Sequence, residues 1–298
     1  MLNQQIKLHP IKPISRNNLK PLSNITKKLK KYYFIQEIQA LTKRLYLQIL
    51  RKPLTVITGI IQPLIWLILF SALFQNAPIK LLQNNIQYNE FLNPGIIIFT
   101  AFTGSMNSGL TIIFDREFGF LNRLLVSPLK NRYSLLFSLF ISTWSITAIQ
   151  IFLIMMCNIL LNTHNNMICY VYQILILATL IIITIASLSI CLAFLLPGHI
   201  EFLACILISN LPILFSSTAL APLAFMPSWL QFLACLNPLT YAIEILRYLY
   251  SNHQIIYNTN IIKTIWITLS IKNSIIILLL INTINLIITQ YILKYKYE

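Results

Sequence analysis

Six runs of apolar residues, each about 19–29 residues long and almost free of charge, constrain the fold of this 298-residue chain more than any other feature. A helix needs about 20 apolar residues to cross the roughly 30 Å hydrocarbon core of a bilayer. Only 10% of the residues are charged, whereas soluble domains are about 25% charged. The pattern predicts an all-α polytopic membrane protein with six transmembrane helices. The expected spans are residues 53–75, 91–114, 133–161, 168–196, 202–220 and 274–293.

The basic residues predict how these spans are oriented. If the N-terminus lies inside, 18 of the 22 Lys and Arg residues fall in inner segments and 4 in outer segments. Such an excess marks the cytoplasm-equivalent side of a membrane protein, so both termini are expected there. Lipid headgroups also account for the net charge of +15. Membrane lipid is therefore an expected partner, and nucleic acid is not.

The segments outside the spans differ in character. Residues 1–31 are basic, contain no acidic residue and are expected to form a disordered tail. A transit peptide is the alternative, but it would be richer in Arg and Ser. Residues 32–52 are expected to form an amphipathic interfacial helix or, alternatively, a soluble helix that faces a partner. Its apolar stripe consists of Phe34, Ile38, Leu41, Leu45 and Ile49. Residues 294–298 are expected to form an inner C-terminal tail.

Charged residues gather between the second and third spans. Residues 115–128 contain Asp115, Arg116, Glu117 and Arg123, although the whole chain has only seven acidic residues. This concentration predicts a contact surface on the inner side of the membrane. We expect the two acidic residues to lie near a helix start, where the positive end of the helix dipole favours negative charge.

An apolar segment on the outer side is interrupted by polar residues. Residues 229–250 contain Asn237, Glu244 and Arg247, and Pro238 prevents one continuous helix. Short helices that dip into the outer leaflet fit this pattern, because irregular backbone at that depth must be shielded by protein. A simple cap over the outer end of the bundle fits equally well.

One face of the second span carries small residues. Ala101, Ser105 and Gly109 recur every four residues. Small side chains let helices approach closely in lipid. The series therefore indicates close packing, either within the chain or between two copies.

No catalytic, cofactor-binding or metal site is predicted on this chain. Gly104 and Gly109 have the spacing of a phosphate-binding loop, but Leu110-Thr111 stand where Lys and Ser or Thr are required. The five cysteines lack metal-ligand spacing, and the four histidines are dispersed. Glu201, beside a Pro-Gly pair, is interpreted as a solvated turn residue.

Two motifs resemble those of the permeases of ABC-2 type transporters. The first runs from Asn93-Pro94-Gly95 through Phe114-Asp115-Arg116-Glu117-Phe118-Gly119 to Arg123-Leu124-Leu125-Val126-Ser127-Pro128. The second is Leu236-Asn237-Pro238-Leu239-Thr240-Tyr241-Ala242-Ile243-Glu244-Ile245-Leu246-Arg247. Both occur in the expected order, and the resemblance covers residues 32–293.

The resemblance implies an exporter permease of six helices that works as a homodimer and is not itself an enzyme. It implies a separate ATPase subunit that binds ATP and Mg and docks on the inner side. The implied coupling-loop residues are Asp115, Arg116, Glu117, Gly119, Arg123, Ser127 and Pro128. The implied residues of an outer re-entrant motif are Asn237, Pro238, Thr240, Tyr241, Glu244 and Arg247. A non-transporting assembly or insertion scaffold is the second hypothesis.

Composition indicates the origin of the chain. It has 24 Asn, 15 Lys against 7 Arg, and only 6 Gly. This bias is typical of an AT-rich genome, and the chain resembles the members of the family encoded in red-algal chloroplast genomes. A chloroplast membrane is therefore expected, with the envelope and the thylakoid not distinguished.

Overall fold

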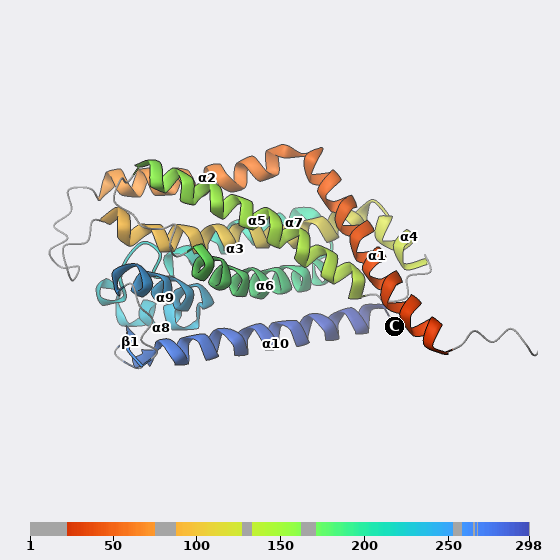
Figure 1. The fold of residues 1–298 in the computed structure, drawn as a ribbon. Helices are drawn as coiled ribbons and strands as arrows, with labels where there is room; N and C mark the ends of the chain where they lie inside the picture. The colour runs from red at the N-terminus through yellow and green to blue at the C-terminus, as the bar shows by residue number, and fades with distance from the viewer. Residues whose placement is uncertain are drawn as a thin grey trace, which may run out of the picture.

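The computed structural model describes residues 23–74, 88–126, 133–161, 171–252, 258–264, 266 and 268–297. These residues form a bundle of long helices (Figure 1). Among the described residues, five helices are long and apolar enough to cross a membrane, and a sharply bent helix pair would make a sixth span. The five are α2 (Pro53–Leu73), α3 (Tyr88–Glu117), α5 (Tyr133–Leu161), α6 (Val171–Leu195) and α10 (Ile271–Tyr297). The prediction of an all-α polytopic membrane protein is confirmed.

The fifth predicted span differs most from the structure. The structure has helix α7 (His199–Phe215) where a span over residues 202–220 was predicted. α7 has 17 residues, which is about 26 Å of helix. Pro212 lies within its last turn and does not end it. The chain then turns through a short 3-10 helix (Leu223–Phe225), which is preceded by Pro222. α7 is therefore shorter than the five spanning helices.

The helix before the first span is longer than predicted. α1 (Ser23–Leu50) begins nine residues earlier than expected, because the last proline of the tail is Pro21 and no helix-breaking residue follows it before position 53. Residues 23–31, predicted to be disordered, are therefore helical, and the rest of the predicted tail lies outside the described residues. Likewise, α10 continues to Tyr297, so the predicted C-terminal tail is mostly helical.

The predicted apolar stripe of α1 packs on the same chain. Its residues are buried or half-buried, whereas Gln36, Gln39 and Lys43 on the other side are exposed. The rings of Phe34 and Phe137 meet edge to face with centroids 6.2 Å apart. α5 therefore covers much of the surface that was expected to face lipid or a partner, and α1 runs obliquely across one end of the bundle (Figure 1).

Helices α3 and α6 form the centre of the bundle. Ala101 and Ser105 are fully buried, and the backbone N–H of Gly109 donates to Ser189 Oγ at 3.0 Å. A β-carbon at Gly109 would lie 2.4 Å from the carbonyl oxygen of Ser189. The small-residue series of the second span therefore serves packing within the chain.

The two ends of the bundle carry different elements (Figure 1). One end, here called the inner end, holds α1, α4 (Phe120–Val126), the turn between α6 and α7, and the C-terminus of α10. The outer end holds α8 (Ser228–Leu236), α9 (Pro238–Asn252) and a small antiparallel hairpin. The hairpin consists of β1 (Asn260–Lys263) and β2 (Thr268–Ser270). The described segments that the distribution of Lys and Arg places on the inner side of the membrane thus lie at the same end of the bundle.

We expect α4 and the hairpin to be accessible from opposite sides of the membrane. Arg123 on α4 and Trp266 beside the hairpin are both exposed. In a variant without native cysteines, a cysteine at Trp266 should react with an impermeant maleimide added outside. A cysteine at Arg123 should react only after permeabilisation. Labelling with the opposite pattern would contradict the orientation derived from the basic residues.

Candidate functional site

Asp115, Arg116 and Glu117 form the C-terminal end of α3. The expectation that the two acidic residues begin a helix is therefore wrong. Gly119 ends the helix with φ of +69°, a conformation that glycine adopts without a steric penalty, and the chain enters α4 at once. Because the C-terminal end of a helix is the negative end of its dipole, both carboxylates need positive partners.

Asp115 is paired with Arg44 of α1. The Arg44 guanidinium donates a hydrogen bond to the Asp115 carboxylate, and both side chains are mostly buried. The same guanidinium lies over the ring of Phe120, 3.6 Å from its centroid. A cation in this position is attracted by the face of the ring. Arg44 thus holds α1 against both α3 and α4.

Arg116 binds the end of α6. Its guanidinium donates to the carbonyl oxygens of Ala193, Leu196 and Pro197 at 3.1, 2.7 and 2.6 Å. Carbonyl groups in the last turn of a helix have no partner within the helix, and a basic side chain satisfies both their hydrogen bonds and their partial negative charge. Arg116 thereby fixes the C-terminus of α6 to α3.

Glu117 binds the start of α7. One carboxylate oxygen accepts the backbone N–H of His199 at 2.8 Å, and the other accepts Nδ1–H of the same residue at 2.7 Å. The favourable dipole interaction expected for this carboxylate is therefore made with the N-terminus of α7 rather than with its own helix. Glu201 is exposed in the first turn of α7, as expected of a solvated residue.

These contacts define a group of side chains that we call the inner clamp. Three consecutive residues of α3 reach three different helices because successive side chains on a helix point about 100° apart. The end of α3, which leads directly into α4, is thus joined by polar contacts to α1, α6 and α7. The inner clamp consists of Arg44, Asp115, Arg116, Glu117 and His199.

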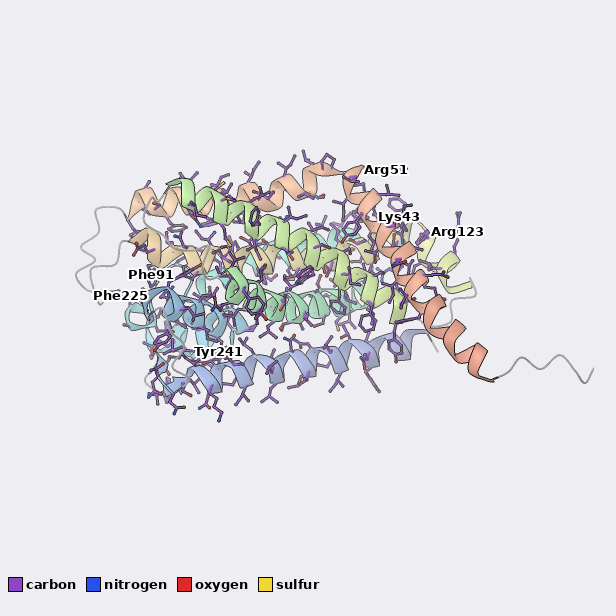
Figure 2. The ribbon with its side chains drawn as sticks, viewed as in Figure 1. Lys43, Arg51, Phe91, Arg123, Phe225 and Tyr241 are labelled. Carbon is purple, nitrogen blue, oxygen red and sulfur yellow. The ribbon has the colours of Figure 1, made fainter. Side chains whose placement is uncertain are left out.

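Beyond the inner clamp, the predicted loop offers an exposed surface. Phe118 is 74% exposed, and Arg123 is exposed on α4 (Figure 2). Gly119 provides the turn that presents them. Ser127 and Pro128 lie outside the described residues.

Sequence reasoning missed Arg44 and His199. Arg44 lies 71 positions before its partner, in a segment whose apolar stripe was recognised but whose charged residues were not assigned partners. His199 was set aside because the histidines are dispersed. Its position beside Pro197-Gly198, at the start of a helix, was the available signal.

The outer motif joins α9 to α7. Asn237 Nδ2 donates to the carbonyl oxygen of Ile213 at 2.8 Å, and its Oδ1 accepts the backbone N–H of Leu239 at 3.0 Å. Pro238 occupies the first position of α9, where the missing N–H is not needed. As predicted, no continuous helix passes this point, and the axes of α8 and α9 differ by 91°.

A second ion pair lies within this motif. Glu244 accepts a hydrogen bond from Arg247, and both side chains are largely buried. Arg247 also donates to the carbonyl oxygen of Thr218 at 2.8 Å and lies 3.7 Å from the ring centroid of Phe91. Tyr241, labelled in Figure 2, donates its hydroxyl to the carbonyl oxygen of Cys235, and Thr240 is fully buried. The motif thus holds α9 against α7 and the loop that follows α7 at the outer end.

The described residues contain no group of three or more His, Cys, Asp or Glu side chains that could hold a metal ion.

Comparison with known proteins identifies a class of membrane transport protein. The model of the family "ABC-2 type transporter" matches residues 36–250. A protein of Cyanophora paradoxa is 49% identical over 285 residues, covering 94% of this chain and 96% of its own length. Proteins of Porphyra purpurea and Pyropia yezoensis are each 48% identical, covering 93% and 99% of this chain and 95% and 98% of their own lengths. All three relatives bear the name "Putative transport permease ycf38".

The fold and these relatives define a multi-pass membrane transport permease. The chain belongs to the ABC-2 type transporter family, as its two motifs indicated.

We expect Arg44 and Asp115 to contribute to stability as a pair. Arg44→Gln and Asp115→Asn should each destabilise the protein, because each leaves a partly buried group without its partner. The double variant should lose less stability than the sum of the two, by about 0.5–3 kcal/mol, as is typical of contacting charged residues. The measurement is the free energy of unfolding of the purified protein in detergent.

Lys43→Gln provides the matched control, since Lys43 is exposed and adjacent in sequence. Its effect should add to that of Asp115→Asn. If Arg44→Gln and Asp115→Asn were also additive, the pair would have no energetic role.

Proposed function

We propose that this chain is the membrane subunit of an exporter driven by a separate ATPase subunit, which docks on α4 at the inner end. The observation that carries this proposal is the inner clamp. It joins the end of α3, which leads into the exposed turn and α4, to three other helices through the side chains of three consecutive residues. ATP and Mg would be bound by the partner.

The exposed part of the loop suits a docking surface. Arginines such as Arg123 often dominate the binding energy at protein interfaces, and phenylalanines such as Phe118 are enriched in interface cores. Phe118 is exposed although it is large and apolar. Binding of the ATPase in one nucleotide state must stabilise one packing of the bundle over another, because a ligand shifts an equilibrium only by its differential affinity.

The apolar surfaces of two helices support a homodimer. Both α2 and α7 expose large apolar side chains along much of their length. Such surfaces face either lipid or a second copy, and closed two-fold dimers are the most common protein assemblies. The exposed residues include Ile61, Ile65 and Leu69 on α2 and Leu203, Leu207 and Leu211 on α7.

The relatives support a plastid membrane as the location. If an ATPase bound the chain but no candidate substrate changed the rate at which that ATPase hydrolyses ATP, the hypothesis of a non-transporting scaffold would be favoured.

We expect variants on the docking surface to lose the ATPase. Phe118→Ala and Arg123→Glu should each lower the amount of ATPase that co-purifies by about tenfold or more, because we expect both residues to be hot spots, whose truncation costs about 2 kcal/mol or more. Expression and membrane insertion should not change. Co-purification from membranes at equal expression is the measurement.

Glu117→Gln serves as a contrasting variant, since Glu117 contacts His199 of the same chain. It should retain the ATPase but weaken the coupling of ATP turnover to transport. Lys272→Glu, an exposed charge reversal at the outer end, is the matched control and should behave as the wild type. Wild-type association in both Phe118→Ala and Arg123→Glu would contradict docking on α4.

A further inference from the structure

A cavity opens on the side of the bundle, where the corner between α1 and α2 meets α3 and α5. Its volume is about 130 Å³, less than the roughly 300–1,000 Å³ of sites that enclose a whole ligand, so it has room for one polar part of a larger molecule. Eight of its fifteen lining residues have polar side chains, although α2 and α5 are mostly apolar. None of the residues of the inner clamp lines it. The cavity is therefore separate from the inner clamp, and its wall combines apolar and polar side chains.

Two amide oxygens in the cavity wall lack hydrogen-bond partners. The Oε1 atoms of Gln48 and Gln150 are buried and accept no hydrogen bond from the described residues. Asn107 also lines the cavity and is exposed, although it lies in the middle of α3. Since buried polar atoms are nearly always hydrogen-bonded in native proteins, the two carbonyl oxygens indicate a bound group that donates hydrogen bonds, such as a hydroxyl.

Close helix packing holds one of these amides in place. A β-carbon at Gly59 of α2 would lie 2.4 Å from Gln150 Nε2, and one at Gly104 of α3 would lie 2.7 Å from Gln150 Oε1. Gln150 Nε2 also donates to the carbonyl oxygen of Val56 at 3.4 Å. Two glycines thus make room for a polar side chain from α5 between α2 and α3, and this arrangement fixes the position of its unpaired oxygen.

The cavity is also positively charged. Lys52 lines it, with Nζ 5.1 Å from the ring centroid of Phe114. Arg51 lies next to it at the corner between α1 and α2 (Figure 2). None of the lining residues is acidic. An anionic group would therefore be attracted to this side of the cavity, and weak screening near lipid strengthens such an interaction.

We propose that the cavity binds the headgroup of an anionic, hydroxyl-bearing amphiphile of the bilayer. The anionic group would accept hydrogen bonds from Lys52, and the hydroxyls would donate to Gln48 and Gln150. The exposed apolar side chains of Leu54 and Ile57 on α2 offer a surface for the acyl chains. The inference concerns binding to this chain alone and does not rest on the proposed ATPase.

Native mass spectrometry of the full-length chain in detergent tests this site with three lipids. Phosphatidylglycerol carries both a phosphate and free hydroxyls, phosphatidic acid lacks the glycerol hydroxyls, and phosphatidylcholine lacks both the net charge and the hydroxyls. Phosphatidylglycerol should bind most tightly and phosphatidylcholine most weakly. Equal binding of these two lipids would overturn the proposal. Competition by soluble glycerol 3-phosphate at the same concentration as the lipid would overturn the assignment to an amphiphile.

Two variants locate the binding. Lys52→Gln should weaken phosphatidylglycerol binding by about tenfold, as expected for the loss of a hydrogen bond to a charged group. Gln150→Met should lower phosphatidylglycerol binding to the level of phosphatidic acid. Lys272→Gln, at the outer end, should bind as the wild type does. If Lys52→Gln or Gln150→Met also bound as the wild type does, the site would not be this cavity.

A further variant covers the case in which these substitutions impair folding. Asn107→Phe fills the cavity from α3 without changing any charge. It should retain the wild-type melting temperature and lose the preference for phosphatidylglycerol. Retention of that preference would overturn the proposal.

Discussion

The rest of the structure depends on the pairing of charges at the inner end of an apolar bundle. A charged group close to lipid is costly unless it has a partner, and α3 ends in three charged residues. Each is satisfied by a different neighbour: Arg44 of α1, carbonyl groups at the end of α6, and His199 of α7. The requirement for pairing thus determines how four helices meet.

The same physical requirement has a different result at the outer end. There the ion pair of Glu244 and Arg247 lies within one helix, and Arg247 reaches the start of α3 and the loop after α7. This junction closes the bundle, and within the described part of the outer end no exposed surface comparable to α4 is joined to it by successive charged residues. The inner end is therefore better suited than the outer end to be displaced by a bound partner. The outer end is better suited to keep its helices in place.

Long apolar runs made α3, α5 and α6 predictable to within three residues or so, because the length and composition of a span are local properties. The end of α7 was not predictable, since it depends on Asn237, which bonds the last turn from 24 positions away. For the site, the charges at 115–117 were recognised, but their partners were not. Arg44 and His199 are distant in sequence, and only the fold brings them to α3.

Double electron–electron resonance tests most directly whether the inner end moves as one body. Spin labels at Lys43 on α1 and Ile200 on α7, both exposed, report on the two helices that the inner clamp joins through α3. In the complex with its ATPase, their distance distribution should stay the same with and without ATP, while the distance from Lys43 to Trp229 at the outer end changes. A change between Lys43 and Ile200 in the wild-type chain would contradict the account.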